Sequence, residues 1–499
     1  MEPKETTSQS DASTSGAAPA PVPAPVLPQD VQHGAGVEAP PTYEEVMGSN
    51  QSSVIEGQPE LPPLAYIDIM PRFLNAGNMR ANIAPVFQKF SDIMQGANLW
   101  LQANPGLECW KCETVERKVD KGPYIDLESM KIHKSTYGFN VYVLGLRMWL
   151  TRKQNNSPPQ QLGLQNVVPA TKEVEIQAYQ YHDMCHNPQM YYLAQRRVTD
   201  VITTFEGLAS TIDTLNEDLK KSPLQGSVLN IETANIKYSG FATDRDPEKT
   251  SFVELGANRM GMFRRNCQII RIFYVLGAPK YEEIHMQDIV PEIVRQSGLV
   301  GSAVFEPFSG AILKAQMWLQ QQSGIKVVNI ETRDVRSHEN IVKLETTVNS
   351  DSTDDFDGSI WSCKYVKMLR IFYVKSPEMT SYASTKLTSR LFPPLRLGVK
   401  TFETMSQTMA RIAAWHSVTR LPIFGVETVH YPFVDNNNIG FNPERSDYST
   451  SKHTGMTLVT AIRLYFPTFY EEPPRHLLPP TLDWLTQGEG RGTPVCSIL

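Results

Sequence analysis

The feature that most constrains the fold is a unit that occurs four times in this sequence. Each copy holds a Glu-Thr pair that opens an alternating, β-rich stretch, followed by an arginine inside a second apolar stretch. The glutamate and the arginine are 34, 39, 39 and 36 residues apart. The glutamates are Glu113, Glu232, Glu331 and Glu427, and the arginines are Arg147, Arg271, Arg370 and Arg463. Such self-similarity is typical of architectures in which neighbouring units complete one another's core.

A helical pattern precedes each Glu-Thr pair, and a weaker alternating segment lies between the two signatures. The expected helices are 87–100, 195–221, 308–319 and 402–415, and the weak strands are 124–133, 251–255, 341–348 and 436–449. One helix on three strands is too small for a generous core, so units are expected to join or pack face to face. The fold class we expect is α+β: about four repeated helix-strand-strand(-strand) units that form antiparallel sheets covered by helices. They would form two pairs or one pseudo-fourfold arrangement, with disordered tails.

The chain divides into six segments on this basis. The folded part comprises four repeat units, and a tail precedes and follows it. The units are 66–152, 153–280, 281–376 and 377–470, and the tails are 1–65 and 471–499.

The repeated glutamates and arginines allow two interpretations. On neighbouring strands each pair would form a cross-strand ion pair, which is worth about 0.2–1 kcal/mol if exposed. The alternative places the four pairs around a ligand groove. The structural interpretation is favoured, because repeated charges in a repeated fold are most simply part of that fold.

The first 65 residues are rich in Pro, Ala, Ser, Gln and Glu, and are expected to be disordered with polyproline II character. They contain Pro40, Pro41 and Tyr43, a PPxY motif, for which a passive spacer is the alternative. Prolines and tyrosine of this kind fill the aromatic groove of a WW domain. The motif and the two glutamates after it resemble ligands of the WW domains in HECT-type ubiquitin ligases.

The last four residues form a C-a-a-X box in which Cys496 would carry the prenyl group, and the terminal leucine selects geranylgeranyl. A single prenyl chain anchors weakly, and only Arg491 lies nearby to assist it. A free carboxylate at Leu499 would instead suit a PDZ domain, and an arbitrary ending is the third possibility. The first reading places the protein on the cytosolic face of a membrane.

Composition excludes several classes of function. Residues 1–60 carry a net charge of −8 and the remainder +2, so a basic surface for nucleic acid is not expected. Six cysteines are too few for a disulfide framework, and a cytosolic protein with reduced thiols is expected. The longest apolar runs are much shorter than a transmembrane helix.

Two clusters of residues have the composition of a chemical site. Cys109 and Cys112 have CxxC spacing, but the segment enters a strand, where the two cysteines fall on opposite faces, so two ordinary thiols are expected. His182, Cys185 and His186 are too close in sequence to converge readily on zinc, and a polar loop is expected. We therefore expect no catalytic residue, no cofactor and no metal.

The chain resembles uncharacterised invertebrate proteins with a PPxY-type amino-terminal arm and similar helix–strand repeats, a resemblance that implies no activity. The function expected first is a non-catalytic, membrane-tethered adaptor that recruits WW-domain proteins and contacts a partner or oligomerises. The first alternative is a self-assembling structural protein whose PPxY recruits membrane-budding machinery. The second is a small-molecule binder, or an enzyme, with a cleft between repeat pairs.

Overall fold

The structure is a computed structural model of the chain. It describes residues 64–77, 85–119, 124–134, 139–181, 195–239, 245–255, 264–297, 302–340, 345–357, 362–376, 381–397, 401–433, 442–451 and 456–478. These residues belong to one compact unit of the chain.

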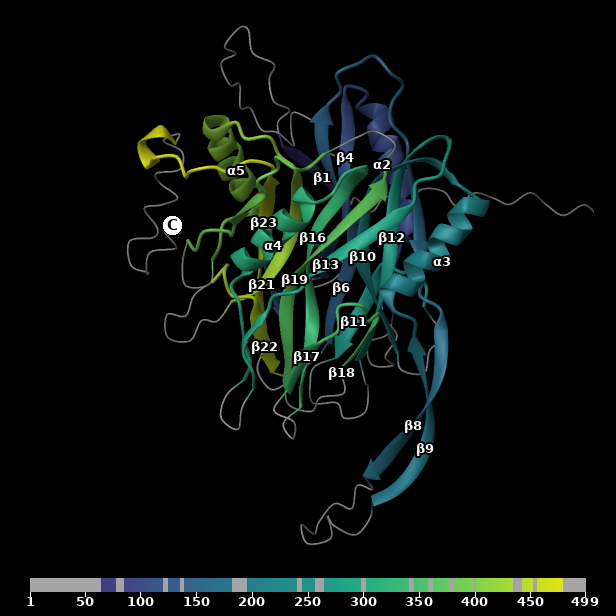
Figure 1. Ribbon diagram of the computed structural model, residues 1–499. Helices are drawn as coiled ribbons and strands as arrows, with labels where there is room; N and C mark the ends of the chain where they lie inside the picture. The colour runs from purple at the N-terminus through teal and green to yellow at the C-terminus, as the bar shows by residue number, and fades with distance from the viewer. Residues whose placement is uncertain are drawn as a thin grey trace, which may run out of the picture. The chain divides into compact units, whose positions relative to one another are not determined.

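Four units share one order of elements: a strand, a helix, a long strand, at least one short strand and a second long strand (Figure 1). Unit 1 contains β1 (Ala65–Ile69), β2 (Phe73–Asn75), β3 (Val86–Phe87), α2 (Phe90–Ala103), β4 (Leu107–Val119), β5 (Lys131–Lys134) and β6 (Phe139–Arg152). Unit 2 contains β7 (Leu162–Val167), β8 (Thr171–Tyr181), β9 (Gln195–Phe205), α3 (Leu208–Lys221), β10 (Leu224–Ser239), β11 (Ser251–Leu255) and β12 (Arg264–Lys280).

Units 3 and 4 follow the same plan. Unit 3 contains β13 (Ile284–Ile289), β14 (Ile293–Arg295), β15 (Val304–Phe305), α4 (Phe308–Gln320), β16 (Ile325–Asn340), β17 (Glu345–Val348), β18 (Asp354–Asp357) and β19 (Ser362–Lys375). Unit 4 contains β20 (Thr388–Phe392), α5 (Met405–Thr419), β21 (Gly425–Phe433), β22 (Asp447–Ser451) and β23 (Met456–Phe466), and the short 3₁₀-helix η3 (Arg475–Leu477) follows it.

The last long strand of each unit is the centre of an antiparallel sheet. In unit 1, β6 pairs along one edge with β4, which carries the Glu-Thr pair. Its other edge is shared: β1 pairs with the carboxyl-terminal half of β6, and β11 of unit 2 pairs with the amino-terminal half. The strands β12, β19 and β23 are arranged in the same way.

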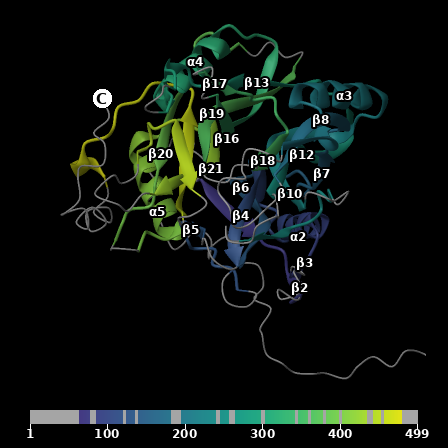
Figure 2. The ribbon, with the colours of Figure 1, turned by 90° about the horizontal axis from the view of Figure 1, so that it is seen from below.

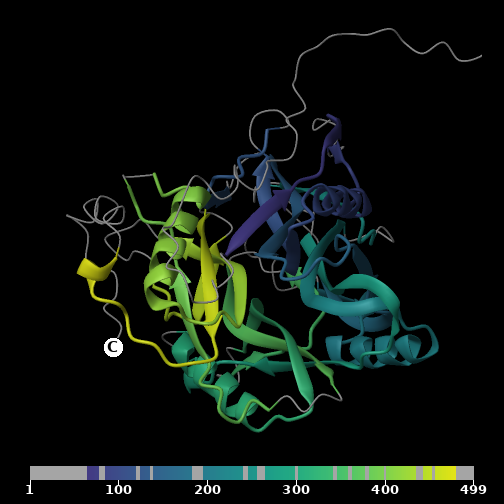
Figure 3. The ribbon, with the colours of Figure 1, turned by 90° about the horizontal axis from the view of Figure 1, so that it is seen from above.

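Each unit therefore gives one short strand to the sheet of the unit before it. Strand β11 joins β6, β18 joins β12, β22 joins β19, and β5 of unit 1 joins β23 of unit 4. The last of these pairings closes a ring of four strand-rich blades, which Figure 2 and Figure 3 show from below and from above. The expectation of repeated antiparallel units is confirmed, in the pseudo-fourfold form rather than as two pairs.

In units 1, 2 and 4 the predicted middle strand belongs to the sheet of the neighbouring unit and not to its own. Strand β11 covers the predicted residues, but it lies in the neighbouring blade. The physical reason is that a strand added to the neighbouring sheet pairs with backbone groups that would otherwise be unpaired at its edge. The strand's own sheet does not need it for this purpose. In unit 3 both solutions occur, since β17 stays with β16 while β18 crosses to β12.

Each blade has its own apolar core, to which the next unit contributes. In blade 1 the apolar side chains of α2 pack with those of β4 and β6, and Phe273 of unit 2 inserts among them. Phe372, Tyr465 and Trp149 occupy the same position in the cores of blades 2, 3 and 4. Each of these aromatic side chains belongs to the following unit, counting unit 1 after unit 4.

The predicted helix 195–221 is wrong in its first half. Residues Gln195–Phe205 form β9, which pairs with β8 in a two-stranded ribbon, and only Leu208–Lys221 is helical. The β-branched residues of 198–204 favour a strand, and their spacing was misread as helical. In unit 3, by contrast, α4 matches the predicted 308–319.

Candidate functional site: the glutamate–threonine–arginine ring

The glutamate and the arginine of each repeat lie directly opposite each other on paired strands. Glu113 is the cross-strand partner of Arg147, and the same register holds in the other three units. All eight residues are buried, with at most 8% of the surface of any one exposed. The energy expected for an exposed pair therefore does not apply, because buried charges need hydrogen bonds to replace water.

Those hydrogen bonds come from the threonine of the preceding unit. The backbone N–H of Thr114 donates to Glu232 Oε2 at 2.8 Å, and its hydroxyl donates to the other carboxylate oxygen. The N–H of Thr332 donates to Glu427 in the same way, and the N–H of Thr233 lies 3.2 Å from both oxygens of Glu331. Each carboxylate is thus hydrogen-bonded to the Glu-Thr strand of the preceding unit.

The arginine of the same unit binds the same threonine. Nη1 of Arg271 donates to the Thr114 hydroxyl at 2.6 Å, so this hydroxyl accepts from the arginine while it donates to the glutamate. The corresponding distances are 3.0 Å from Arg370 to Thr233, 2.8 Å from Arg463 to Thr332 and 2.8 Å from Arg147 to Thr428. The last contact returns from unit 1 to unit 4, and the four sets form a closed cycle.

Burial sets the electrostatics of the cycle. Burial raises the pKa of Glu232, and Arg271 opposes that rise. Burial likewise raises the pKa of Glu331, against the attraction of Arg333 and Arg370. The ring therefore consists of charges that stabilise one another inside the protein, and removing one partner leaves a buried charge without compensation.

The arginine of unit 4 differs from the other three in the residue that accepts its remaining hydrogen bonds. Asp68 on β1 accepts two hydrogen bonds from Arg147, at 2.6 Å each. Asp288 occupies the equivalent position beside Arg370, and Asn166 the one beside Arg271. In unit 4 the register places Leu391 there, and the Tyr431 hydroxyl accepts from Arg463 instead.

A second fourfold contact, which apolar periodicity does not reveal, joins the units at the helix amino termini. We name the segments involved the clasps: 126–130, 246–250, 349–353 and 442–446. Each clasp places an acidic side chain on the first free N–H groups of the preceding unit's helix. Glu248 accepts from Ser91 N at 2.7 Å, Asp351 from Ala209 N at 2.7 Å, Glu444 from Ser309 N at 3.0 Å and Glu128 from Ser406 N at 2.9 Å.

The clasps satisfy donors that a helix leaves unpaired, and their negative charge suits the positive end of the helix. Each begins with Asp or Asn, whose side chain accepts from the N–H of the capping acid. The signal was present in the sequence as Asp or Asn followed two residues later by Glu or Asp. It was missed because helix caps are normally sought immediately before the helix.

At one end of the ring the four Glu-Thr strands enclose a cavity of about 360 Å³ with residues from all four units. Two residues before each repeat glutamate stand Lys111, Asn230, Asn329 and Gly425. The first three each donate to the backbone carbonyl that precedes the glutamate in the preceding unit: Val426, Cys112 and Ile231. Gly425 has no side chain that could donate in this way, which leaves space at the ring axis in this cavity, called the axial cavity below.

Lys111 also crosses this axis. Its ammonium group donates to Asn329 Oδ1 at 2.5 Å, from unit 1 to unit 3. Burial lowers the pKa of Lys111, while Glu113 and the three other ring glutamates oppose that change. The repeated Glu and Arg residues do not line the cavity.

The expectation that Cys109 and Cys112 lie on opposite faces is wrong. Their sulfur atoms are 3.5 Å apart, and both side chains belong to the core of blade 1. The register of β4 against β6 shifts between Cys109 and Lys111, which marks a β-bulge at Trp110. A bulge adds one residue and reverses the alternation, so positions three apart share a face.

The remaining candidate residues lie outside the described part of the chain. They are Pro40, Pro41, Tyr43, His182, Cys185, His186 and Cys496. Among the described residues, no group of three or more His, Cys, Asp or Glu side chains is placed to hold a metal ion. Within the same residues, no helix has the length and apolar character that a membrane crossing requires.

Comparison with known proteins gives no match. No family model matches the chain, and neither a curated protein nor a solved structure is significantly similar to it.

Proposed function

We propose that the protein is a non-catalytic adaptor in which the ring is a scaffold and the PPxY motif recruits a WW-domain protein. The observation that carries this proposal is that the glutamate and the arginine of each unit bind the threonine of the preceding unit, across all four junctions. Residues that close a ring are occupied, so the motif at Pro40, Pro41 and Tyr43 is the part of the chain best suited to recognition. The ring would then be completed by helices α2 to α5 as an outer layer over the sheets, in keeping with their positions in Figure 2.

A binding measurement tests the recruitment. Titration of the full-length protein with a purified WW domain from a HECT-type ligase should give saturable binding, which Tyr43→Ala abolishes without a change in thermal stability. Tyr124→Ala is the matched control, since Tyr124 is an exposed tyrosine of the ring itself. Equal affinities of Tyr43→Ala and the unmodified chain would reject the recruitment.

Attachment to the cytosolic face of a membrane is the second part of the proposal. The Cys496 box acts only when it ends the chain, so the mass of the protein purified from eukaryotic cells is decisive. A geranylgeranyl group on Cys496, with loss of the last three residues and of membrane association in Cys496→Ser, supports the anchor. An unmodified Leu499 terminus in the soluble fraction removes it and leaves PDZ binding to be tested.

A self-assembling structural protein is the alternative function, and the β8–β9 ribbon favours it. These strands pair with each other in a sheet separate from the four blade sheets, and the ribbon extends below the ring in Figure 1. A two-stranded ribbon is marginally stable in water, and its outer edges offer backbone groups to a second copy. Light scattering of the purified protein separates the functions: a monomer or dimer supports the adaptor, and a large closed particle supports assembly.

A further inference from the structure

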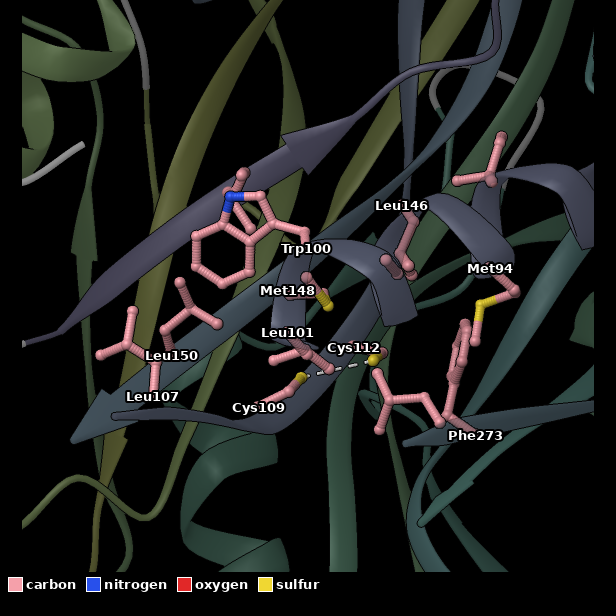
Figure 4. Packing of buried hydrophobic residues seen from close by; sticks show 14 of the residues in the cluster. Met94, Trp100, Leu101, Leu107, Cys109, Cys112, Leu146, Met148, Leu150 and Phe273 are labelled. Carbon is pink, nitrogen blue, oxygen red and sulfur yellow. Dashed lines mark hydrogen bonds between the residues drawn. The ribbon is translucent and has the colours of Figure 1, made fainter. Parts of the chain in front are cut away.

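The thiols of Cys109 and Cys112 lie side by side, and neither takes part in the glutamate–threonine–arginine contacts between units. Figure 4 shows both sulfur atoms on one side of β4, among Leu101, Leu107 and Met148. Both cysteines are reduced and almost fully buried, with 1% and 0% of their surface exposed. At 3.5 Å the sulfur atoms are in contact, and about 1.5 Å of movement would bring them to bonding distance.

The β-bulge at Trp110 makes this approach possible. In a regular strand two residues three apart point to opposite faces, and no rotamer brings their sulfurs together. Here the register shift lies inside the CxxC sequence itself. The equivalent bulges of β10 and β16, at Leu229 and Val328, are not flanked by cysteines.

One of the two cysteines also adjoins the axial cavity. Cys109 is one of the residues that line the axial cavity, and Gly425 lines the same cavity from unit 4. Cys112 does not line the cavity, and burial, followed by the neighbouring Cys109, raises the pKa of its thiol well above the usual value. Of the two cysteines, Cys109 is therefore the one next to the cavity.

We propose that Cys109 and Cys112 form a reversible disulfide when a peroxide enters the axial cavity. The Cys109 sulfur attacks one peroxide oxygen, the O–O bond breaks, and Cys109 becomes a sulfenic acid as water leaves. The Cys112 sulfur then displaces the hydroxyl group, which takes the thiol proton and leaves as a second water. Two thiols lose two electrons in total, and the peroxide gains them; a dithiol reductant reverses the change.

The bond would act at the junction that closes the ring. It spans Trp110, whose side chain packs against the core of blade 4. It also spans Lys111, which donates to the Val426 carbonyl of unit 4 and to Asn329 of unit 3. Oxidation of this pair therefore modifies the contact of unit 1 with unit 4, independently of the WW-binding function proposed above.

Peptide mapping of the folded full-length protein tests the proposal. The protein is exposed to hydrogen peroxide, denatured with iodoacetamide present, and digested with trypsin, which cuts after Lys111. A disulfide joins peptides 90–111 and 112–117, and the joined pair should separate on reduction. Recovery of both peptides in alkylated form, or of a doubly oxygenated Cys109 beside an alkylated Cys112, overturns the proposal.

Substitutions of the cysteines and of two glycines test the role of each thiol and of the cavity. Cys112→Ser should leave a Cys109 sulfenic acid that dimedone traps, and Cys109→Ser should slow oxidation of Cys112 at least tenfold. Cys267 and Cys363, buried on β12 and β19, are internal controls and should remain alkylated. Gly425→Asn should slow formation of the disulfide at least threefold by filling the cavity, whereas Gly277→Asn, placed in open space, should not. An unchanged rate in Gly425→Asn rejects the axial route.

Discussion

Glu113 in the first unit accepts the backbone N–H of Thr428 in the fourth at 2.9 Å, across 315 residues of sequence. This contact has the same geometry as those between units that follow each other in the chain. The ring is thus closed by the repeat signature itself, without a special closing element.

Thr428→Val should destabilise the protein by about 2–3 kcal/mol, because the change leaves the buried Arg147 without one of its acceptors and Glu113 without a donor. Chemical denaturation followed by tryptophan fluorescence measures the loss. Thr401→Val, at an exposed threonine, is the control and should have no effect. A loss below about 0.5 kcal/mol for Thr428→Val would show that the ring contact contributes little.

Glu248→Ala should cost about 1–2 kcal/mol, because it removes the cap on helix α2. Hydrogen exchange should locate the effect: the amide of Ser91 should exchange faster than in the unmodified protein. Glu217→Ala, at an exposed position of α3, serves for comparison. Unchanged exchange at Ser91 would contradict the assignment of Glu248 as the cap.

Stability should fall as the pH is lowered, because of His430. Burial lowers the pKa of this histidine from 6.5 to about 3. Below pH 6.5 the unfolded chain binds a proton that the folded protein does not, so proton binding lowers the free energy of the unfolded state and the free energy of unfolding falls. The loss is about 2 kcal/mol at pH 5. The loss grows as the pH falls further and levels off below the folded pKa of about 3, where both states bind the proton.

The measurement is the denaturation midpoint at pH 7 and at pH 5. His430→Asn should reduce the difference between the two values, since asparagine keeps an acceptor for the Thr460 hydroxyl and does not titrate. His133→Asn, at an exposed site, should leave the difference as it is. Equal pH dependence in His430→Asn and the unmodified protein would exclude His430 as the source.

Gly425→Asn should stabilise the protein by about 1 kcal/mol, because its amide would donate a hydrogen bond as the side chains of Lys111, Asn230 and Asn329 do in the other three units. A Cβ at this position meets only ordinary contacts with Tyr465, at 3.5 Å and beyond. Thermal unfolding compares it with Gly277→Asn, which adds the same side chain where a Cβ has no neighbour within 4 Å. A lower melting temperature for Gly425→Asn alone would mean that the axial space must stay open.

The sequence identified the repeat, α4 and the strand Ser251–Leu255, because apolar periodicity reports local structure directly. It did not identify the partner of that strand, since alternation is the same whichever sheet a strand joins. The Cys109–Cys112 contact was missed for a related reason. A bulge changes which residues share a face, and nothing in the residue pattern announced one at Trp110.

The glutamates and arginines were located correctly, but the threonine beside each glutamate was read only as part of the signature. Its role appears once neighbouring units are in place, since Thr114 binds Glu232 and Arg271 of another unit. Long-range contacts of this kind cannot be obtained from one repeat considered alone. The clasp acids, such as Glu128, escaped for the same reason.

The position of β5 on β23 has a consequence for synthesis of the chain. The ribosome makes β5 early and its partner strand among the last segments, so Lys131–Lys134 must wait for Met456–Val459. At ordinary elongation rates the delay is on the order of tens of seconds. During that time the first blade emerges with an unpaired strand and a clasp acid that has no helix to bind. Premature termination anywhere before β23 would therefore leave the amino-terminal unit in an exposed state that chaperones and proteases recognise.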